Sequence, residues 1–250
     1  GTDVRGIMLG FEGYYDYRYL SADVSGTELT VSGERAQGLR IKCGGNVKLS
    51  SISIDASGTE AKGVYVRNTL SSDVSGTKIA VSGDRGVGID VNNLYAGSGN
   101  LIKISNTSID VTGGGAEGIN SYGAESAYVS GTKIVVSGDK CIGLYGRGTR
   151  ANDALEISNT SIDVTGTRAK GIDTVDLSAN ISGAKIVVSG DSGVGLGISS
   201  CRNSEISNTS IDVTGSSAYG ISVFSSDVYI KDAVATMRSN EGTGAQIWNN

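Results

Sequence analysis

One nine-residue string, SNTSIDVTG, occurs three times in the chain, at residues 105–113, 158–166 and 207–215. A sister string, SGTKI followed by an aliphatic residue and VSGD, occurs at 75–84 and 130–139, with variants at 25–34 and 182–191. Aligned on their central aliphatic residue, these strings extend to nine anchors: Leu29, Ile54, Ile79, Ile109, Ile134, Ile162, Ile186, Ile211 and Met237. The anchors stand 24 to 30 residues apart, so the chain is an internal repeat with units of about 26 residues.

Several other positions of the unit are nearly constant. Valine or alanine follows the anchor by two residues, and glycine follows it by four residues, in the first eight units. Glycine also stands nine residues after the anchor in eight of the nine units, with Gln246 as the exception. An aliphatic residue, such as Leu39 or Ile119, stands ten residues after it. Apolar residues that alternate in this way, between glycine or serine corners, predict short strands and tight turns.

Three short strands in one unit cannot bury an apolar face alone, but stacked units bury a continuous column. The sequence therefore predicts an all-β fold, a right-handed parallel β-helix solenoid of about nine coils, as a single domain over residues 1–250. At a strand spacing of about 4.8 Å, the rod would be roughly 43 Å long. The constant glycines are expected where a corner needs positive φ or where a neighbouring strand approaches closely. The absence of proline is consistent, because every interior strand donates hydrogen bonds to a neighbour.

The residues beside the anchor alternate from coil to coil. Odd coils carry a long charged residue just before it, at Glu28, Lys78, Lys133 and Lys185, and even coils carry aspartate just after it, at Asp55, Asp110, Asp163 and Asp212. Both positions should point outward, with like charges two coils apart. The pattern is either a carboxylate ladder that binds Ca²⁺ or a sugar, or charge alternation on a solvated sheet. Three residues before the anchor, asparagine alternates with glycine, which is typical of a left-handed corner.

Composition excludes several classes of function. The chain has no histidine, so it lacks a Ser–His or Cys–His pair and an imidazole base. A net charge of −5 disfavours a nucleic-acid partner, and no apolar run is long enough for membrane insertion. Cys43, Cys141 and Cys201 form neither a metal motif nor a disulfide framework and are interpreted as structural thiols. We expect no cofactor, no metal site and no catalytic residue.

Length varies mainly between the tenth position of a unit and the next anchor. The first of these longer segments holds four tyrosines, Tyr14, Tyr15, Tyr17 and Tyr19, which form either a contact patch for sugar or protein or a cap over the first coil. Tyr65 and Tyr145 share a column and are expected to pack beside loops. The chain enters and leaves in mid-coil, so we expect either a segment of a longer rod or edges that meet partners.

The runs SNTSIDVTGTRAKGID (158–173) and VSGTKIVVSGDKCIGLYG (129–146) resemble the passenger domains of bacterial autotransporter adhesins of the pertactin and AIDA type. The likeness covers essentially the whole chain, and its motifs encode coil geometry. It implies an extracellular, cell-surface rod that acts in adhesion or self-association. Its partners would be other protein chains or further copies of itself, meeting end to end or side by side.

Three functional hypotheses follow. The first is a non-enzymatic adhesin, spacer or fibre subunit, which predicts no deep polar cleft and no clustered acids with a raised pKa. The alternative is a polysaccharide-binding or polysaccharide-degrading β-helix of the tailspike or pectin-lyase type, with a groove near 90–109 and 145–161 lined by tyrosine and at least two acids. The third is ice binding by a threonine column, although these side chains should point inward: Thr77, Thr107, Thr132, Thr160 and Thr209.

Overall fold

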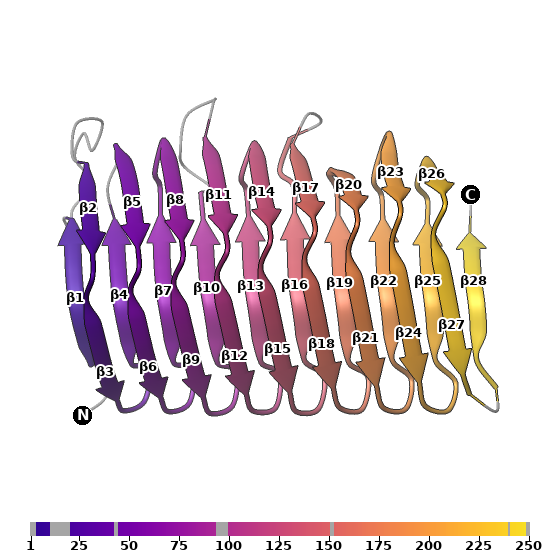
Figure 1. Ribbon diagram of the computed structural model, residues 1–250, viewed down its shortest axis with the longest axis horizontal. Coiled ribbons are helices and arrows are strands. Elements are labelled where there is room, and N and C mark those ends of the chain that lie inside the picture. The colour runs from indigo at the N-terminus through magenta and orange to yellow at the C-terminus, as the bar shows by residue number, and fades with distance from the viewer. Residues whose placement is uncertain are drawn as a thin grey trace.

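The computed structural model describes residues 4–10, 21–42, 45–93, 100–150, 153–239 and 241–248 of the 250-residue chain. In these ranges the chain forms strands and no helix, so there is no helix that could cross a membrane. The strands wind through about nine turns of a solenoid. The turns stack side by side along the long axis of Figure 1. Three parallel sheets result, and the predicted all-β solenoid is confirmed.

Each coil contributes one strand to each sheet. Sheet A contains β1 (Arg5–Gly10), β4 (Gln37–Lys42), β7 (Lys62–Arg67), β10 (Val87–Asn92), β13 (Glu117–Tyr122), β16 (Ile142–Arg147), β19 (Lys170–Val175), β22 (Val194–Ser199), β25 (Tyr219–Phe224) and β28 (Thr243–Trp248). Sheet B contains β2 (Ala22–Ser25), β5 (Asn46–Ser50), β8 (Ser71–Ser75), β11 (Leu101–Ser105), β14 (Ser126–Ser130), β17 (Ala154–Ser158), β20 (Ser178–Ser182), β23 (Ser204–Ser207) and β26 (Val228–Lys231). Sheet C contains β3 (Glu28–Ser32), β6 (Ser53–Ser57), β9 (Lys78–Ser82), β12 (Ser108–Thr112), β15 (Lys133–Ser137), β18 (Ser161–Thr165), β21 (Lys185–Ser189), β24 (Ser210–Thr214) and β27 (Val234–Arg238).

Two of the three corners keep a constant length. Two residues join each sheet B strand to the following sheet C strand, and four residues join sheet C to sheet A, as in 33–36 between β3 and β4. Only the corner from sheet A to sheet B varies, from the two residues 176–177 to the eleven residues 11–21. The insertions therefore lie along one edge of the rod, as the repeat alignment predicts.

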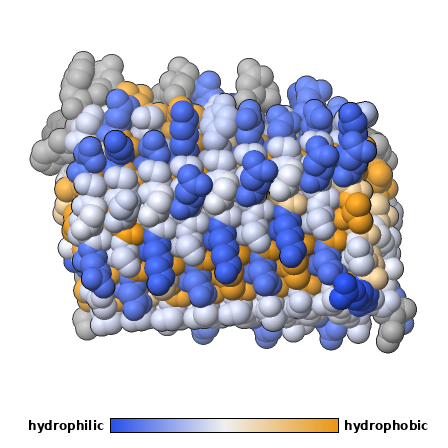
Figure 2. Space-filling model, in the orientation of Figure 1, coloured by the Kyte–Doolittle hydropathy of each residue, from blue (hydrophilic) through white to orange (hydrophobic). Residues whose placement is uncertain are grey.

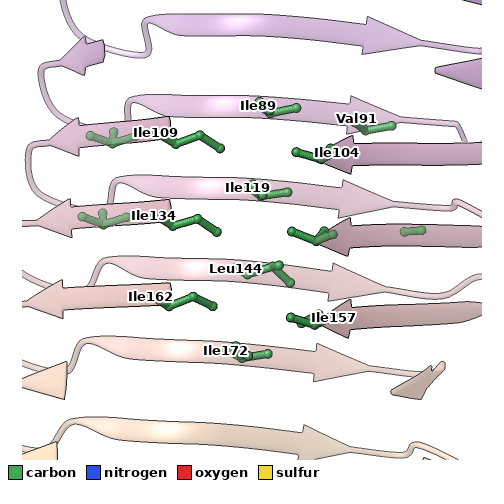
Figure 3. Close-up of a cluster of buried hydrophobic side chains, with 14 of the residues drawn as sticks. Ile89, Val91, Ile104, Ile109, Ile119, Ile134, Leu144, Ile157, Ile162 and Ile172 are labelled. Atoms are coloured by element: carbon green, nitrogen blue, oxygen red, sulfur yellow. The ribbon is translucent and has the colours of Figure 1, made fainter. Parts of the chain in front are cut away.

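Columns of aliphatic side chains fill the interior. Figure 3 shows side chains of sheet A facing those of sheet C, with members of sheet B beside them. The labelled residues of sheets A and C are at most 1% exposed, and they are Ile89, Val91, Ile109, Ile119, Ile134, Leu144, Ile162 and Ile172. Because every coil adds the same set of side chains in register, the core is continuous along the rod.

The two glycine columns have different physical roles. Four residues after the anchor, the backbone has positive φ, as at Gly113 (φ +141°), where a Cβ would lie 2.2 Å from the carbonyl oxygen of Gly83. Nine residues after the anchor, the sheets approach closely: a Cβ on Gly118 would lie 2.4 Å from the carbonyl oxygen of Gly143 and 2.4 Å from Cγ2 of Ile134. Positive φ is therefore confirmed in the first column, and close approach is confirmed in both.

The corner between sheets B and C explains the alternation of asparagine and glycine. Asn106 and Gly131 both have left-handed backbones, with φ of 50° and 56°. A Cβ on Gly131 would lie 2.6 Å from Oδ1 of Asn106, and Gly183 has the same relation to Asn159 at 2.8 Å. The asparagine side chain of one coil thus lies at the next coil's Cβ position, and the left-handed backbone there also favours glycine.

The last coil departs from the predicted alignment. Ile211 pairs with Ala235, whereas the predicted anchor Met237 pairs with Val213. Moving the anchor by two residues places Gly244 in the ninth position, so Gln246 is no longer an exception. The alignment was wrong because Met237 is large and apolar like an anchor, while alanine occupies the true anchor position.

The predicted threonine column points inward, so it offers no flat hydroxyl face for ice. These side chains are 1–2% exposed. Each hydroxyl donates a hydrogen bond to the backbone carbonyl two residues earlier, as Thr107 does to Ser105 at 3.0 Å. The hydroxyls are therefore satisfied within the corner.

Candidate functional site

The tyrosine patch predicted from the sequence lies outside the described residues. This applies to Tyr14, Tyr15, Tyr17 and Tyr19, and also to Cys43. That prediction remains untested. Within the described part of the chain, charged side chains lie on the outward faces of all three sheets, and tyrosine side chains join them on sheets A and B.

The central outward column of sheet A holds chemistry-bearing side chains on six successive coils. In register from the N-terminal side, these are Arg40, Tyr65, Asp90, Asn120, Tyr145 and Asp173. Lys62 and Glu117 stand in the column beside it, two coils apart, with Val87 between them. We refer to Arg40, Lys62, Tyr65, Asp90, Glu117 and Asn120 as the sheet A cluster.

Asp90 is the most enclosed charge in this cluster, at 7% exposure. Its Oδ2 forms an ion pair with Nζ of Lys62, which belongs to the preceding coil. The same ammonium group lies 4.4 Å from the centre of the Tyr65 ring, and the Arg40 guanidinium lies 5.6 Å from it. Lys62 therefore compensates a largely buried carboxylate while the tyrosine ring partly shields the ammonium from water.

Glu117 belongs to the coil after Asp90 and is partly buried. Burial raises its pKa to about 7, and the negative charge of Asp90 adds to this effect. A hydrogen bond with Asn120 and the positive charge of Lys62 lower the pKa and only partly offset the increase. Near neutral pH, Glu117 thus exchanges its proton beside the carboxylate of Asp90.

A second pair follows three coils along from Asp90. Nζ of Lys170 lies 2.7 Å from Oδ2 of Asp173, which is 9% exposed. A Cβ on Gly197 would lie 2.9 Å from Oδ1 of Asp173, so glycine in the next coil leaves room for the carboxylate. Burial is the main cause of the raised pKa of Tyr145, and the negative charges of Asp173 and Glu117 raise it further.

This arrangement can move a proton. A carboxylic acid that titrates near 7, beside a second carboxylate and a lysine, is the combination that acid–base chemistry uses. The adhesin hypothesis predicted no clustered acids with a raised pKa, and Glu117 contradicts that expectation. Within the described ranges, histidine, cysteine, aspartate and glutamate side chains form no group of three that could hold a metal ion.

The outward face of sheet B contains a groove with a volume of about 520 Å³. Tyr128, Glu156, Asn180 and Glu205 line it from four successive coils, and we refer to these four as the Tyr–Glu groove. An adjoining hollow shares Glu205 and extends to Tyr229. Tyrosine and two acids are the lining that the polysaccharide hypothesis predicted, and Glu156 lies in one of its expected segments, 145–161. No described residue of the other expected segment, 90–109, lines the groove.

The alternating charges of sheet C are present as predicted. Asp110 stands in register with Ala80 and Val135, so the nearest aspartates of its column are two coils away. Lys133 stands between Ser108 and Ser161 in the neighbouring column. Figure 2 shows such rows, in which hydrophilic side chains recur at regular intervals along the rod with apolar surface between them. The regular spacing favours the interpretation as a solvated, charge-alternating sheet.

Cys141 and Cys201 are buried free thiols. Sγ of Cys141 donates to the carbonyl oxygen of Gly138 at 2.7 Å, and burial raises its pKa to about 11. Cys201 contacts the backbone and the hydroxyl of Thr174. Both thiols fill interior positions of the coil, as the structural interpretation predicts.

Sequence reasoning missed the sheet A cluster because its members fall outside the repeated string. Tyr65 and Tyr145 were expected to pack beside loops, but they occupy mid-strand positions of β7 and β16. One signal was available: the eighth and eleventh positions after the anchor change in residue type from coil to coil, and they carry Lys62, Asp90 and Glu117. Sequence alone could not show that Lys62 reaches Asp90 diagonally across coils.

No protein-family model matches the chain, and no curated protein matches its sequence. Among solved structures, it is similar to a chain in the cryo-EM structure of the Vag8–C1 inhibitor complex, in which Vag8 is an autotransporter passenger domain. The TM-score is 0.52 at 17% identity, over 98% of this chain and 73% of that chain. At this identity the likeness concerns the fold, and it supports the β-helix that the resemblance to passenger domains implies.

Proposed function

We propose that this chain is an extracellular or cell-surface β-helical rod that acts in adhesion, by binding a partner or by self-association. The observation that carries the proposal is the uninterrupted stack of three sheets, which holds outward side chains in fixed columns along the rod. Such a solenoid offers a long, rigid surface whose side chains are organised before binding. Vag8, the similar protein, was solved in a complex with C1 inhibitor, which supports a protein partner as one mode of adhesion.

The proposal is tested with beads coated with the purified 250-residue chain. We expect the beads to clump with one another or to attach to a layer of cultured cells above the level of albumin-coated beads. Sedimentation of the free chain distinguishes self-association from attachment to a receptor. Beads that neither clump nor attach, although the chain remains folded by circular dichroism, would overturn the adhesive function.

A second candidate, cleavage of a polysaccharide, is favoured by the sheet A cluster. Glu117 would act as the proton donor or acceptor, and the ion pair of Lys62 and Asp90 would supply the charges beside it. Incubation with acidic and neutral polysaccharides, followed by measurement of new chain ends, tests this activity. Glu117→Gln should abolish it while Asp73→Asn, in the charge-balanced half of sheet B, leaves it unchanged. An absence of new chain ends with every polymer would remove this candidate.

A further inference from the structure

We propose that the Tyr–Glu groove on sheet B binds a neutral glycan chain that runs along the rod axis, with one sugar ring per coil. This inference rests on the proposed adhesive function and names its ligand class and surface. It concerns a face that is separate from the sheet A cluster.

The four groove residues and Tyr229 of the adjoining hollow form one column in strict register. Tyr128 pairs with Glu156, Glu156 with Asn180, Asn180 with Glu205, and Glu205 with Tyr229. Successive side chains are therefore about 4.8 Å apart along the axis. The two tyrosines at the ends of the column are 37% and 62% exposed, so their rings are accessible to a ligand.

The same column has a different composition in its N-terminal half. There Asp23, Lys48, Asp73 and Lys103 stand in register, so opposite charges face each other on neighbouring coils. Such alternation is favourable on a solvated sheet. In the C-terminal half no lysine or arginine stands between the two glutamates, and neither carboxylate makes an ion pair within the described part of the chain. The groove therefore departs from the pattern that surface charge balance alone would produce.

The hydrogen-bonding groups of the groove suit sugar hydroxyls. Each carboxylate can accept from two hydroxyl donors. Oδ1 of Asn180 accepts from the backbone N–H of Glu205 at 3.3 Å, which directs the amide NH₂ of Asn180 away from the strand as a donor. Tyrosine presents a flat apolar ring that can lie against the C–H face of a sugar, and a phenol that stays in water. Acceptors, a donor and aromatic rings thus alternate along the groove.

Spacing disfavours an extended peptide as the ligand, and charge disfavours an acidic glycan. An extended peptide places side chains on one face about every 6.6 Å, which does not match a column with a step of about 4.8 Å. A ring in an extended β-linked glycan advances by a length close to that step, so one ring can meet each coil. An acidic glycan would meet two uncompensated carboxylates. A neutral glycan satisfies both the spacing and the charge.

The test measures binding of neutral β-linked hexasaccharides, namely cellohexaose, xylohexaose, mannohexaose and hexa-N-acetylchitohexaose, to the full chain by calorimetry. We expect at least one to bind, and Tyr128→Ala or Glu156→Gln to weaken it by about tenfold or more, as for the loss of a well-placed contact. Asp73→Asn, in the charge-balanced half of the same column, is the matched control and should change affinity less than about twofold. Thermal melts establish that all variants are folded.

Three results would overturn the proposal: no neutral hexasaccharide binds, the groove variants bind as well as the wild type, or a lysine-rich peptide or chitosan hexamer binds more tightly. The bead assay separates the two levels of inference. If coated beads still adhere while every hexasaccharide fails, the glycan groove is wrong and the adhesive function stands. If adhesion also fails, the adhesive function falls as well.

Discussion

On sheet A, the carboxylate of Asp90 is 7% exposed and paired with Lys62, whereas on sheet B the glutamates of the Tyr–Glu groove are exposed and make no ion pair within the described residues. Both faces rest on the same coils and the same strand spacing. The strands beneath them differ, because every sheet A strand carries a glycine at its second residue and no sheet B strand contains one. The comparison indicates that the Asp90–Lys62 pair on sheet A is part of the folded packing, while the groove glutamates on sheet B are exposed and accessible to the proposed ligand.

The largest effect is expected from Gly118→Ala, beneath the sheet A cluster. The added methyl group would overlap the backbone of Gly143 and the side chain of Ile134, both 2.4 Å away. Overpacking of this kind costs about 3 kcal/mol, and backbone atoms cannot rotate out of the way. Urea unfolding followed by circular dichroism measures the loss.

Gly114→Ala is the matched control for that substitution. Its Cβ would meet only Oδ1 of Asp84, at 3.5 Å, an ordinary contact. We expect a change of no more than about 0.5 kcal/mol, because the unfolded chain loses some freedom while the folded chain accepts the methyl group. Equal losses in both variants would contradict the close-approach role of the ninth-position glycines.

The next effect concerns pH. The pKa of Glu117 is raised to about 7 in the folded chain from 4.5, so its stabilising contribution is complete below pH 4.5 and is lost as pH rises through 7. The unfolding free energy should fall over this window by up to about 3 kcal/mol, an upper bound because the side chain retains some contact with water. Glu117→Gln should remove this slope. Glu156→Gln, on sheet B, should retain it.

A smaller effect is expected from Lys62→Met. The substitution leaves Asp90 partly buried without its cation, and we expect a loss of about 2 kcal/mol, below the range for fully buried pairs because Lys62 keeps some exposure. The double variant Lys62→Met with Asp90→Leu should recover most of the stability. If the double variant is as unstable as the single one, the ion pair is not what stabilises this face.

The sequence allowed the interior to be predicted better than the surface, for a physical reason. The residue types of Ile109, Gly113 and Asn106 recur along the chain because each coil must pack against the next one. The same packing constraints therefore act on all coils. The last coil was misaligned where Ala235 replaces the expected large anchor. Lys62, Asp90 and Glu117 carry no such constraint, and their contact depends on a diagonal reach across coils. The Tyr–Glu groove was foreseen only as a lining of tyrosine and acids, since its register needed the strand pairing.

The smallest effect is expected on sheet B, and it separates a binding role from a structural one. Glu156 and Glu205 stand two coils apart, about 10 Å, which is comparable to the screening length at physiological salt. Glu156→Gln should therefore change the unfolding free energy by less than about 0.5 kcal/mol, because the repulsion from Glu205 that it removes is matched by the attraction of Lys103, two coils away on the other side. At low salt the change should stay small, since both interactions strengthen together. A clear loss of stability would mean that this carboxylate belongs to the fold, as Asp90 does, and the contrast between the two faces would fail.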